Sequence, residues 1–371
     1  MKALLKILAL ASALFPSLFD PAPVAAQGDP KFIELDAFHS ANPKERGKAE
    51  AFARRIYGAA GHLKVSVERP VTIHIIYPGL QRSDYWRRSV KSFTARMDEI
   101  GIPHKITALF TKSADDLRLQ EKAIGEVLRE KPDFLIFTLD ALRHKGMISR
   151  VLASGETRVI LQNITTPLTD LGPPSPLLYV GFDHGVGSML LADEHIKRAG
   201  KKARYAIFYG PVGYVSKMRG GTFKRHISSK TDYKLGAEYY VGFDRARARE
   251  AALGLFRIDK NFSFVFAAST DIAHGITDAL DELGLLGSIT VNGWGGGSTE
   301  ITAIQNREID FTVMRMNDDN GVAMAEAIQM TLEGETHNIP QVYSGSFSMV
   351  DQTTSDTTLE TLIDHAFRYS R

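Results

Sequence analysis

The chain has 371 residues, a formal net charge of +2 and no cysteine. A near-neutral surface argues against nucleic acid as the main partner, and the lack of cysteine excludes disulfides and thiolate catalysis. The length predicts one or two domains.

The first 26 residues have the layout of a cleaved secretory signal. Basic residues precede an apolar stretch over 7–19, and Val24 and Ala26 supply small side chains before the expected cut. A transmembrane anchor needs about 20 consecutive apolar residues, and Pro16 interrupts this stretch. We therefore expect residues 1–26 to be a signal peptide and the mature chain to lie outside the cytoplasm, with no insertion into a membrane.

Strand-like runs alternate with helical patterns from Val71 onward. Residues 27–69 lack this rhythm and form an N-terminal extension, in which residues 44–57 are expected to be helical. The predicted strands cover 71–76, 106–110, 134–139, 159–162, 178–182, 205–209, 239–241, 262–268, 289–291 and 311–314. Such alternation predicts an α/β fold with parallel sheets covered on both faces, and the runs are numerous enough for two doubly wound lobes.

The chain has only two tryptophans, and each follows a strand-like run. Trp86 closes a polar segment behind 71–76, and Trp294 lies among glycines behind 289–291. Open α/β sheets bind small ligands at the carboxyl ends of their strands. Two rings from opposite halves of the chain therefore predict a cleft that closes from both sides. Trp86 also lies on the apolar stripe of the next helix, so partial burial in the core is its alternative.

Polar side chains follow nearly every predicted strand. They are amides, hydroxyls, carboxylates and arginines, which suit a small, oxygen-rich ligand and one with negative charge. The candidates are Gln81, Ser83, Thr138, Asp140, Asn163, Arg219, Thr270, Asp271 and Arg315. Capping of the next helix is the alternative for the threonines and aspartates among them. A surface ion pair is the alternative for each arginine.

Motifs for catalysis are weak or missing. The chain has no G-x-S-x-G elbow and no H-E-x-x-H zinc pair. The run Gly295-Gly296-Gly297 lacks the lysine and spacing of a P-loop and is expected to make a tight turn. His184 follows Asp183, a pair that is expected to mark a turn rather than a catalytic dyad. We expect a binding protein without enzyme activity, metal site or cofactor.

Several segments resemble the LuxP family of periplasmic receptors for autoinducer-2. They are residues 77–86, 137–140, 161–167, 179–184, 292–297 and 313–319, within a likeness that runs from about Val71 to Ser370. The resemblance implies a type I periplasmic-binding fold, in which two lobes joined by three crossovers close on the ligand. It also implies that the ligand is autoinducer-2, a furanosyl borate diester whose boron belongs to the ligand, and that the partner is a LuxQ-like membrane sensor histidine kinase.

The resemblance also implies a set of ligand contacts, carried over by matching motif. They are Gln81, Ser83, Trp86, Asn163, Arg219, Thr270, Trp294 and Arg315. Thr138, Asp140 and Asp271 are further candidates from their positions alone. A tetrahedral borate is anionic, and two guanidinium groups suit its charge and its oxygens. Leu80 and Arg82 depart from the family's pattern beside the serine, which leaves open either an altered specificity or exposure to solvent.

The lobes are expected to be discontinuous in sequence. We expect crossovers after Asn163, after Trp294 and near Tyr343, where the chain has just supplied groups that face the ligand. The first lobe then holds residues 70–164 and 296–342, and the second holds residues 165–295 and 343–371.

Three other functions are compatible with parts of the sequence. The sugar-binding component of an ABC importer is the main alternative, since it has the same fold. A periplasmic hydrolase requires a nucleophile with an adjacent base, which we do not find. The ligand domain of a cytoplasmic repressor is contradicted by the predicted signal peptide and by the lack of a helix-turn-helix pattern.

Overall fold

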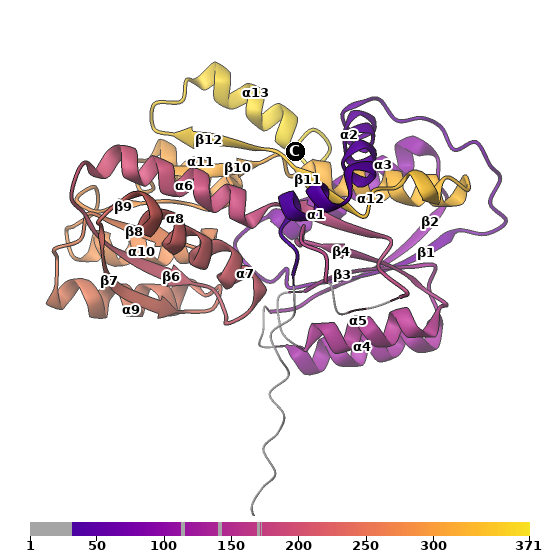
Figure 1. Ribbon diagram of the computed structural model, residues 1–371, viewed down its shortest axis with the longest axis horizontal. Helices are drawn as coiled ribbons and strands as arrows, with labels where there is room; N and C mark the ends of the chain where they lie inside the picture. The colour runs from indigo at the N-terminus through magenta and orange to yellow at the C-terminus, as the bar shows by residue number, and fades with distance from the viewer. Residues whose placement is uncertain (1–31, 113–115, 140–142, 169–170, 172) are drawn as a thin grey trace, which may run out of the picture.

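Two lobes lie side by side in the computed structural model, each built around parallel strands (Figure 1). The structure describes residues 32–112, 116–139, 143–168, 171 and 173–371, so the predicted signal peptide lies outside it. Across those ranges, no helix combines the length and the apolar character that crossing a bilayer requires.

The first lobe is built on a six-stranded parallel sheet in the order β11-β5-β4-β3-β1-β2. The strands are β1 (Val71–Tyr77), β2 (His104–Phe110), β3 (Phe134–Thr138), β4 (Arg158–Gln162), β5 (Leu178–Phe182) and β11 (Val342–Gly345). The helices are α1 (Leu35–Ala41), α2 (Pro43–Tyr57), α3 (Tyr85–Ile100), α4 (Leu117–Glu130), α5 (His144–Ser154) and α12 (Asp318–Leu332), with a short 3₁₀ turn at Thr336–Asn338.

Helices cover both faces of this sheet because its side chains alternate between two cores. Phe134 and Ile136 of β3 belong to the core shared with α3 and α12. Their neighbours Leu135 and Phe137 belong to the core shared with α4 and α5. Figure 1 shows the second pair of helices below the sheet. The predicted doubly wound arrangement is therefore confirmed in this lobe.

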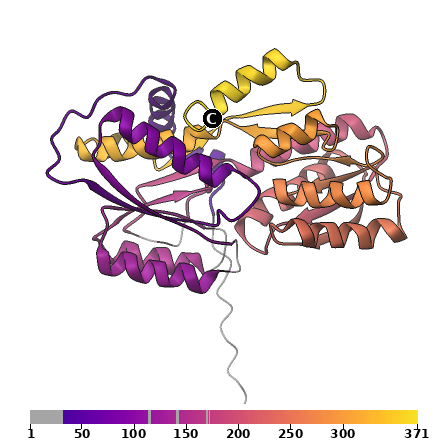
Figure 2. The ribbon, with the colours of Figure 1, turned by 180° about the vertical axis from the view of Figure 1, so that it is seen from behind.

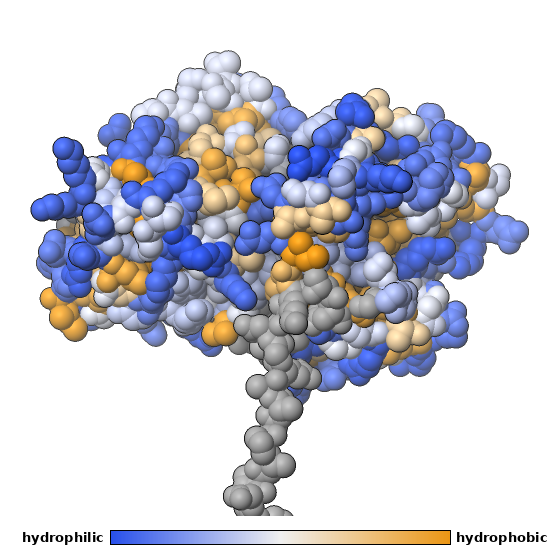
Figure 3. Space-filling view, in the orientation of Figure 1, coloured by the Kyte–Doolittle hydropathy of each residue, from blue (hydrophilic) through white to orange (hydrophobic). Residues whose placement is uncertain are grey.

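The second lobe is built on a four-stranded parallel sheet in the order β7-β6-β8-β9. The strands are β6 (Arg204–Tyr209), β7 (Lys234–Tyr240), β8 (Phe264–Ala267) and β9 (Thr290–Val291), followed by the antiparallel pair β10 (Phe311–Arg315) and β12 (Phe347–Asp351). The helices are α6 (His184–Ala199), α7 (Tyr214–Ser216), a π-helix (Lys217–Gly221), α8 (Thr222–Lys230), α9 (Arg245–Ile258), α10 (Thr270–Glu282), α11 (Ser298–Gln305) and α13 (Asp356–Ala366). Helix α6 exposes the apolar side chains of Val186, Met189 and Leu190. Figure 3 shows hydrophobic residues interspersed among hydrophilic ones on one face of the molecule.

The first crossover comes later in the chain than the sequence predicted. Strand β5, with Leu178–Phe182, pairs with β4 and β11 in the first sheet. The chain therefore leaves the first lobe after Phe182 and not after Asn163, so the expected boundary at residues 164 and 165 is wrong. Asn163 follows a strand that lies inside the sheet, which shows that a residue facing the cleft does not mark a hinge.

The second crossover is also later than predicted. Single parallel bridges join Asn292 to Phe311 and Gly295 to Met314, so β10 continues the second sheet beyond β9. The chain returns to the first lobe only after Arg315, where α12 begins, and the expected boundary at residues 295 and 296 is wrong. The third crossover lies between β11 and β12, within a few residues of the expected Tyr343.

The N-terminal extension packs against the first lobe. The helix expected over 44–57 is present as α2, which begins with Pro43 in the first turn, a position that proline favours. Arg55 of α2 pairs with Glu326 of α12, and Glu326 also accepts from Arg96 at 2.8 Å. Glu326 and Arg96 are each 1% exposed, so α2 is attached to a buried ion pair.

His195 of α6 lies in the core of the second lobe. Its ring stacks on Phe264 with centroids 4.4 Å apart, and its Nε2 lies 3.0 Å from Oδ1 of Asn292. Because burial removes the solvent that stabilises an imidazolium, the pKa of His195 is lowered from 6.5 to about 3.

This shift predicts that acid weakens the fold. Between pH 6.5 and about 3 the unfolded chain binds a proton at His195 that the folded chain excludes, so the free energy of unfolding falls as the pH falls. At pH 5 the His195 contribution is about 2 kcal/mol relative to pH 7.5. Urea unfolding of His195→Phe should show a pH dependence smaller by that amount. An unchanged pH dependence in this variant would show that His195 is protonated in the folded state.

Candidate ligand-binding site

A pocket lies between the two lobes. It is lined by Pro78, Gln81, Ser83, Tyr85, Trp86, Asn163, Val215, Arg219, Phe243, Ser269, Thr270, Trp294 and Arg315. All eight residues that the resemblance implied are in this set. The structure thus brings these residues together, while their contact with a ligand stays a prediction.

The pocket residues come from the carboxyl ends of strands in both lobes. Gln81, Ser83 and Trp86 follow β1, and Asn163 follows β4. The second lobe contributes Arg219 after β6, Thr270 after β8, Trp294 after β9 and Arg315 at the end of β10. Parallel strands direct their carboxyl ends to one edge of a sheet, and the two edges face each other here.

Arg219 is held in place by the second lobe. It lies within the π-helix Lys217–Gly221, an irregular turn of a kind that is frequent at functional sites. Its Nη1 donates to the carbonyl of Ala268 at 2.8 Å, and its guanidinium carbon lies 3.6 Å from the ring centroid of Trp294. The guanidinium is therefore fixed against a ring that favours a cation.

Arg315 reaches the pocket from the last residue of β10. Its guanidinium carbon lies 4.0 Å from the ring centroid of Tyr85, and its Nε has no hydrogen-bond partner among the described residues. Gly295 has φ +128°, and a Cβ there would come within 2.3 Å of this guanidinium. Glycine is therefore required at this position both for its backbone angle and for space.

The glycine-rich turn is held by a buried carboxylate. Glu300 accepts from the amides of Trp294 at 2.9 Å and Gly296 at 2.8 Å, and from the hydroxyl of Thr312 at 2.7 Å. The tight turn that the sequence predicted here is present, with Gly296 at φ +65°. The same hydrogen bonds occupy Glu300, so its carboxylate does not pair with either arginine.

The pocket carries positive charge that the protein does not neutralise. Neither Arg219 nor Arg315 forms an ion pair within 4.0 Å with a carboxylate of the described chain, and each is at most 5% exposed. Burial and the charge of Arg315 lower the pKa of Arg219 well below its ordinary value, and burial lowers that of Arg315. Guanidinium groups nevertheless remain protonated in proteins. An anionic ligand would offset the free-energy cost of keeping two buried guanidinium groups charged.

His184 positions Arg219 and is neutral. Its Nε2 lies 3.1 Å from the carbonyl oxygen of Asn163, which can only accept, so Nε2 carries the proton. Its Nδ1 then accepts from Nε of Arg219 at 3.3 Å. Burial and the two arginines lower the pKa of His184 well below its ordinary value. Asp183 caps α6 through the amide of Val186, as a turn residue would, and forms no dyad with His184.

Asn163 offers the pocket a free polar group. It adopts a left-handed backbone with φ +66°, and its buried Oδ1 has no partner among the described residues. A buried amide without a partner costs free energy, so the site is suited to a ligand that donates to it.

The two tryptophans form apolar walls. Trp86 is 4% exposed, and its ring centroid lies 4.6 Å from that of Tyr77. It therefore belongs to the core of the first lobe and also lines the pocket. Trp294 is 1% exposed and packs edge-on against Phe347. Both interpretations of Trp86, core residue and pocket wall, therefore apply.

Thr138 and Asp271, two of the three further candidates, do not line the pocket. Thr138 is buried at the end of β3, and Asp140 lies outside the described residues. Asp271 accepts from the amides of Arg82 at 3.1 Å and Ser83 at 3.4 Å, so it joins the second lobe to the loop of the first that carries Gln81 and Ser83. The cap of α10 is Ser269, which accepts from the amide of Ile272.

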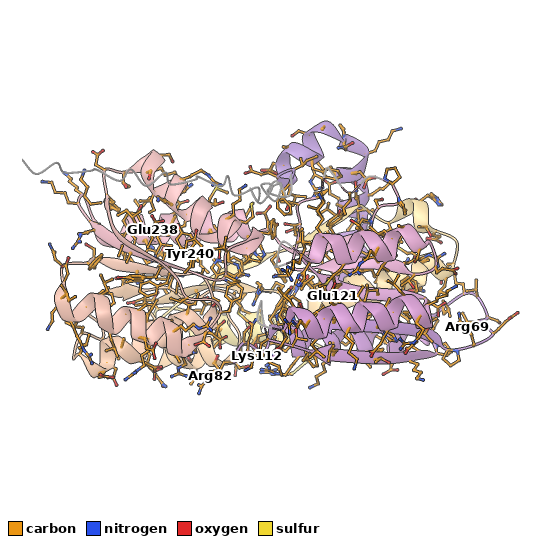
Figure 4. All side chains as sticks on the ribbon, turned by 90° about the horizontal axis from the view of Figure 1, so that it is seen from below. Arg69, Arg82, Lys112, Glu121, Glu238 and Tyr240 are labelled. Atoms are coloured by element: carbon orange, nitrogen blue, oxygen red, sulfur yellow. The ribbon has the colours of Figure 1, made fainter. Side chains whose placement is uncertain are left out.

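Five lining residues were missed: Pro78, Tyr85, Val215, Phe243 and Ser269. Tyr85 directly precedes Trp86, and Ser269 directly precedes Thr270. Their position next to predicted contacts could have identified them as pocket residues. Val215 and Phe243 depend on the path of loops, which sequence patterns do not give. Leu80 is 58% exposed and lines, with Arg82, an adjoining groove. Figure 4 labels Arg82 near the lower edge of the molecule in that view.

The sequence matches the profile described as "Periplasmic binding protein domain" over residues 73–336, which is more than half of the chain. The protein therefore belongs to the periplasmic binding protein family.

Solved structures of similar fold include an ABC transporter solute binding protein from Agrobacterium vitis with bound D-fucose. It is 16% identical, with a TM-score of 0.71 and coverage of 78% of this chain and 99% of that one. Another such protein, from Actinobacillus succinogenes 130z with bound D-allose, is 20% identical. Its TM-score is 0.66, and the match covers 79% of this chain and 100% of that one. A chain of the XylFII-LytSN complex is 16% identical, with a TM-score of 0.65 and coverage of 77% and 99%. At these identities the likeness establishes the fold alone.

Replacement of Arg315 by alanine should weaken ligand binding strongly. Loss of one charged partner of a desolvated anion typically costs about 2–5 kcal/mol, which corresponds to a loss of affinity on the order of 30- to several-thousand-fold. Calorimetry with autoinducer-2, the ligand expected from the sequence, measures this loss. Arg129→Ala is the control, because that side chain is 69% exposed on α4. Equal affinities for the two variants would remove Arg315 from the site.

Proposed function

We propose that this protein is a periplasmic receptor that closes on a small, oxygen-rich ligand with negative charge and catalyses no reaction. The observation that carries the proposal is the buried pair Arg219 and Arg315, which has no carboxylate partner in the described chain. Hydrogen-bond donors with fixed positions and two charges suit an anion with several oxygens.

We further propose that the ligand is autoinducer-2 in its furanosyl borate form. Support comes from the sequence motifs that resemble the LuxP family and from the match between an anionic tetrahedral borate and two guanidinium groups. Gln81, Ser83, Asn163 and Thr270 supply amides and hydroxyls for the furanosyl oxygens, and the tryptophans supply apolar walls.

The second candidate is a sugar-binding protein of an ABC importer. The comparisons favour this function over a quorum-sensing receptor, because the similar structures include solute binding proteins of ABC transporters with bound D-fucose and D-allose. The pocket favours the receptor, because a neutral sugar has no negative charge to balance the two buried guanidinium groups.

Dependence on borate separates the two candidates. Binding of autoinducer-2, measured by calorimetry, should weaken in buffer stripped of boron and should recover when borate is added, because the borate supplies the negative charge. D-Fucose and D-allose, titrated under the same conditions, should bind weakly and without response to borate. Tight binding of either sugar, together with indifference of autoinducer-2 to borate, would favour the importer.

We propose a membrane sensor histidine kinase, of the LuxQ type that the resemblance implies, as the downstream partner. A partner can detect the ligand only if it binds the open and closed forms with different affinities. The lobes of this protein are joined by three crossovers, so closure changes the surfaces that lie across them. A kinase domain that spans such a surface would respond to closure.

Reconstituted membranes test the partner. With the kinase encoded nearby, ligand should change kinase activity only when this protein is present, and Arg315→Ala should require much more ligand for the same change. A permease reconstituted in its place should transport no ligand. Transport that depends on ligand, without any change in kinase activity, would contradict the receptor while leaving the pocket as described.

A further inference from the structure

The C-terminal tail, residues 367–371, returns from the second lobe to the first. Leu359 and Ala366 of α13 and Phe367 belong to the core of the second lobe. Tyr369 and Ser370, which follow, bind residues of α3 and α12 in the first lobe. Figure 1 shows α13 over the second lobe and the C-terminus between the two lobes. The chain thus crosses between the lobes once more after the third crossover.

Asp318 anchors this tail to the first lobe. Its carboxylate accepts from the amide of Tyr369 at 2.7 Å, the amide of Ser370 at 2.9 Å and the hydroxyl of Ser370 at 2.7 Å. Asp318 is fully buried, so these three hydrogen bonds replace its water. Arg368 pairs with the next residue, Asp319, at 2.6 Å.

Arg88 of α3 is the second anchor. It donates to the carbonyl of Ser370 at 2.8 Å, and its guanidinium lies 3.8 Å from the ring centroid of Phe367. It also donates to Oγ of Ser298, at the start of α11 in the second lobe, at 2.7 Å. One side chain of the first lobe therefore holds both the tail and the second lobe. Figure 2 shows α3 from behind, directed toward the seam between the lobes.

Both anchors lie close to pocket residues in the chain. Asp318 comes three residues after Arg315, at the second crossover, and Arg88 comes two residues after Trp86. A displacement of the tail would therefore reach the second crossover and the first turn of α3 together.

We propose that residues 367–371 act as a noncovalent strap that sets the angle between the lobes and so positions Arg315 and Trp86. The inference deepens the proposed function, since it rests on a pocket that closes around its ligand. With the strap in place, the angle to which the free protein opens is limited, so less reorganisation is needed to close on the ligand. Without it, the three crossovers and the remaining side-chain contacts between the lobes restrain opening, among them Asp271 with the amide of Arg82.

Distances between spin labels on the two lobes test the strap. The chain has no cysteine, so Glu121→Cys in the first lobe and Ile258→Cys in the second give unique labels at positions 57% and 89% exposed. Removal of residues 369–371 should lengthen and broaden the distance distribution of the free protein. Autoinducer-2 with borate should bring the truncated chain to the distance of the full chain with the same ligand. If truncation lowers the closed fraction of the free protein about tenfold, the apparent affinity falls about tenfold.

Arg371→Ala is the matched control, because that side chain is exposed and, among the described residues, pairs only with Asp364 at the surface. It should leave both the distances and the affinity unchanged. If the truncated chain does not fold, Ser370→Pro decides instead, since it removes the amide and hydroxyl that Asp318 binds. A folded variant with wild-type distances and an affinity within twofold of wild type would overturn the proposal. The free-protein distances need no ligand, so a wrong ligand assignment would not affect them.

Discussion

The site depends on two guanidinium groups that are buried in one pocket and have no carboxylate partner among the described residues. Arg219 lies against Trp294 and Arg315 against Tyr85, so aromatic faces partly compensate for the water that each cation loses. An anionic ligand would offset the remaining free-energy cost of burying the two positive charges. A pocket built in this way selects for negative charge before it selects for shape.

The structure around the arginines serves to hold them. Glu300 is occupied by the backbone amides of the glycine-rich turn and so leaves Arg315 unpaired. His184 is neutral and accepts from Arg219 while donating to the carbonyl of Asn163, which links the two lobes beside the pocket. A protonated His184 would add a third positive charge, and burial prevents this.

Sequence patterns predicted the fold and identified residues that line the pocket. They placed the first two crossovers between the lobes too early in the chain. Strand and helix periodicity gave the two lobes, and residues at strand ends gave both tryptophans and both arginines. The positions of the crossovers depend on which sheet each strand joins. The residues of β5 and β10 do not indicate that β5 pairs within the first sheet and β10 beside the second. His184 was interpreted as a turn residue because its partners, Arg219 and the carbonyl of Asn163, are distant in sequence. Asp271 was expected in the pocket, yet it binds the amides of Arg82 and Ser83 across the lobes.

The identity of the ligand that copurifies with the protein tests the account most directly. Protein purified from cells that produce autoinducer-2 would be denatured, and the released small molecule would be examined by mass spectrometry and boron NMR. The account predicts one equivalent of a furanosyl compound with a tetrahedral boron signal, and its loss from Arg315→Ala. An equimolar neutral sugar without boron, retained by that variant, would contradict the claim that the paired arginines select an anion.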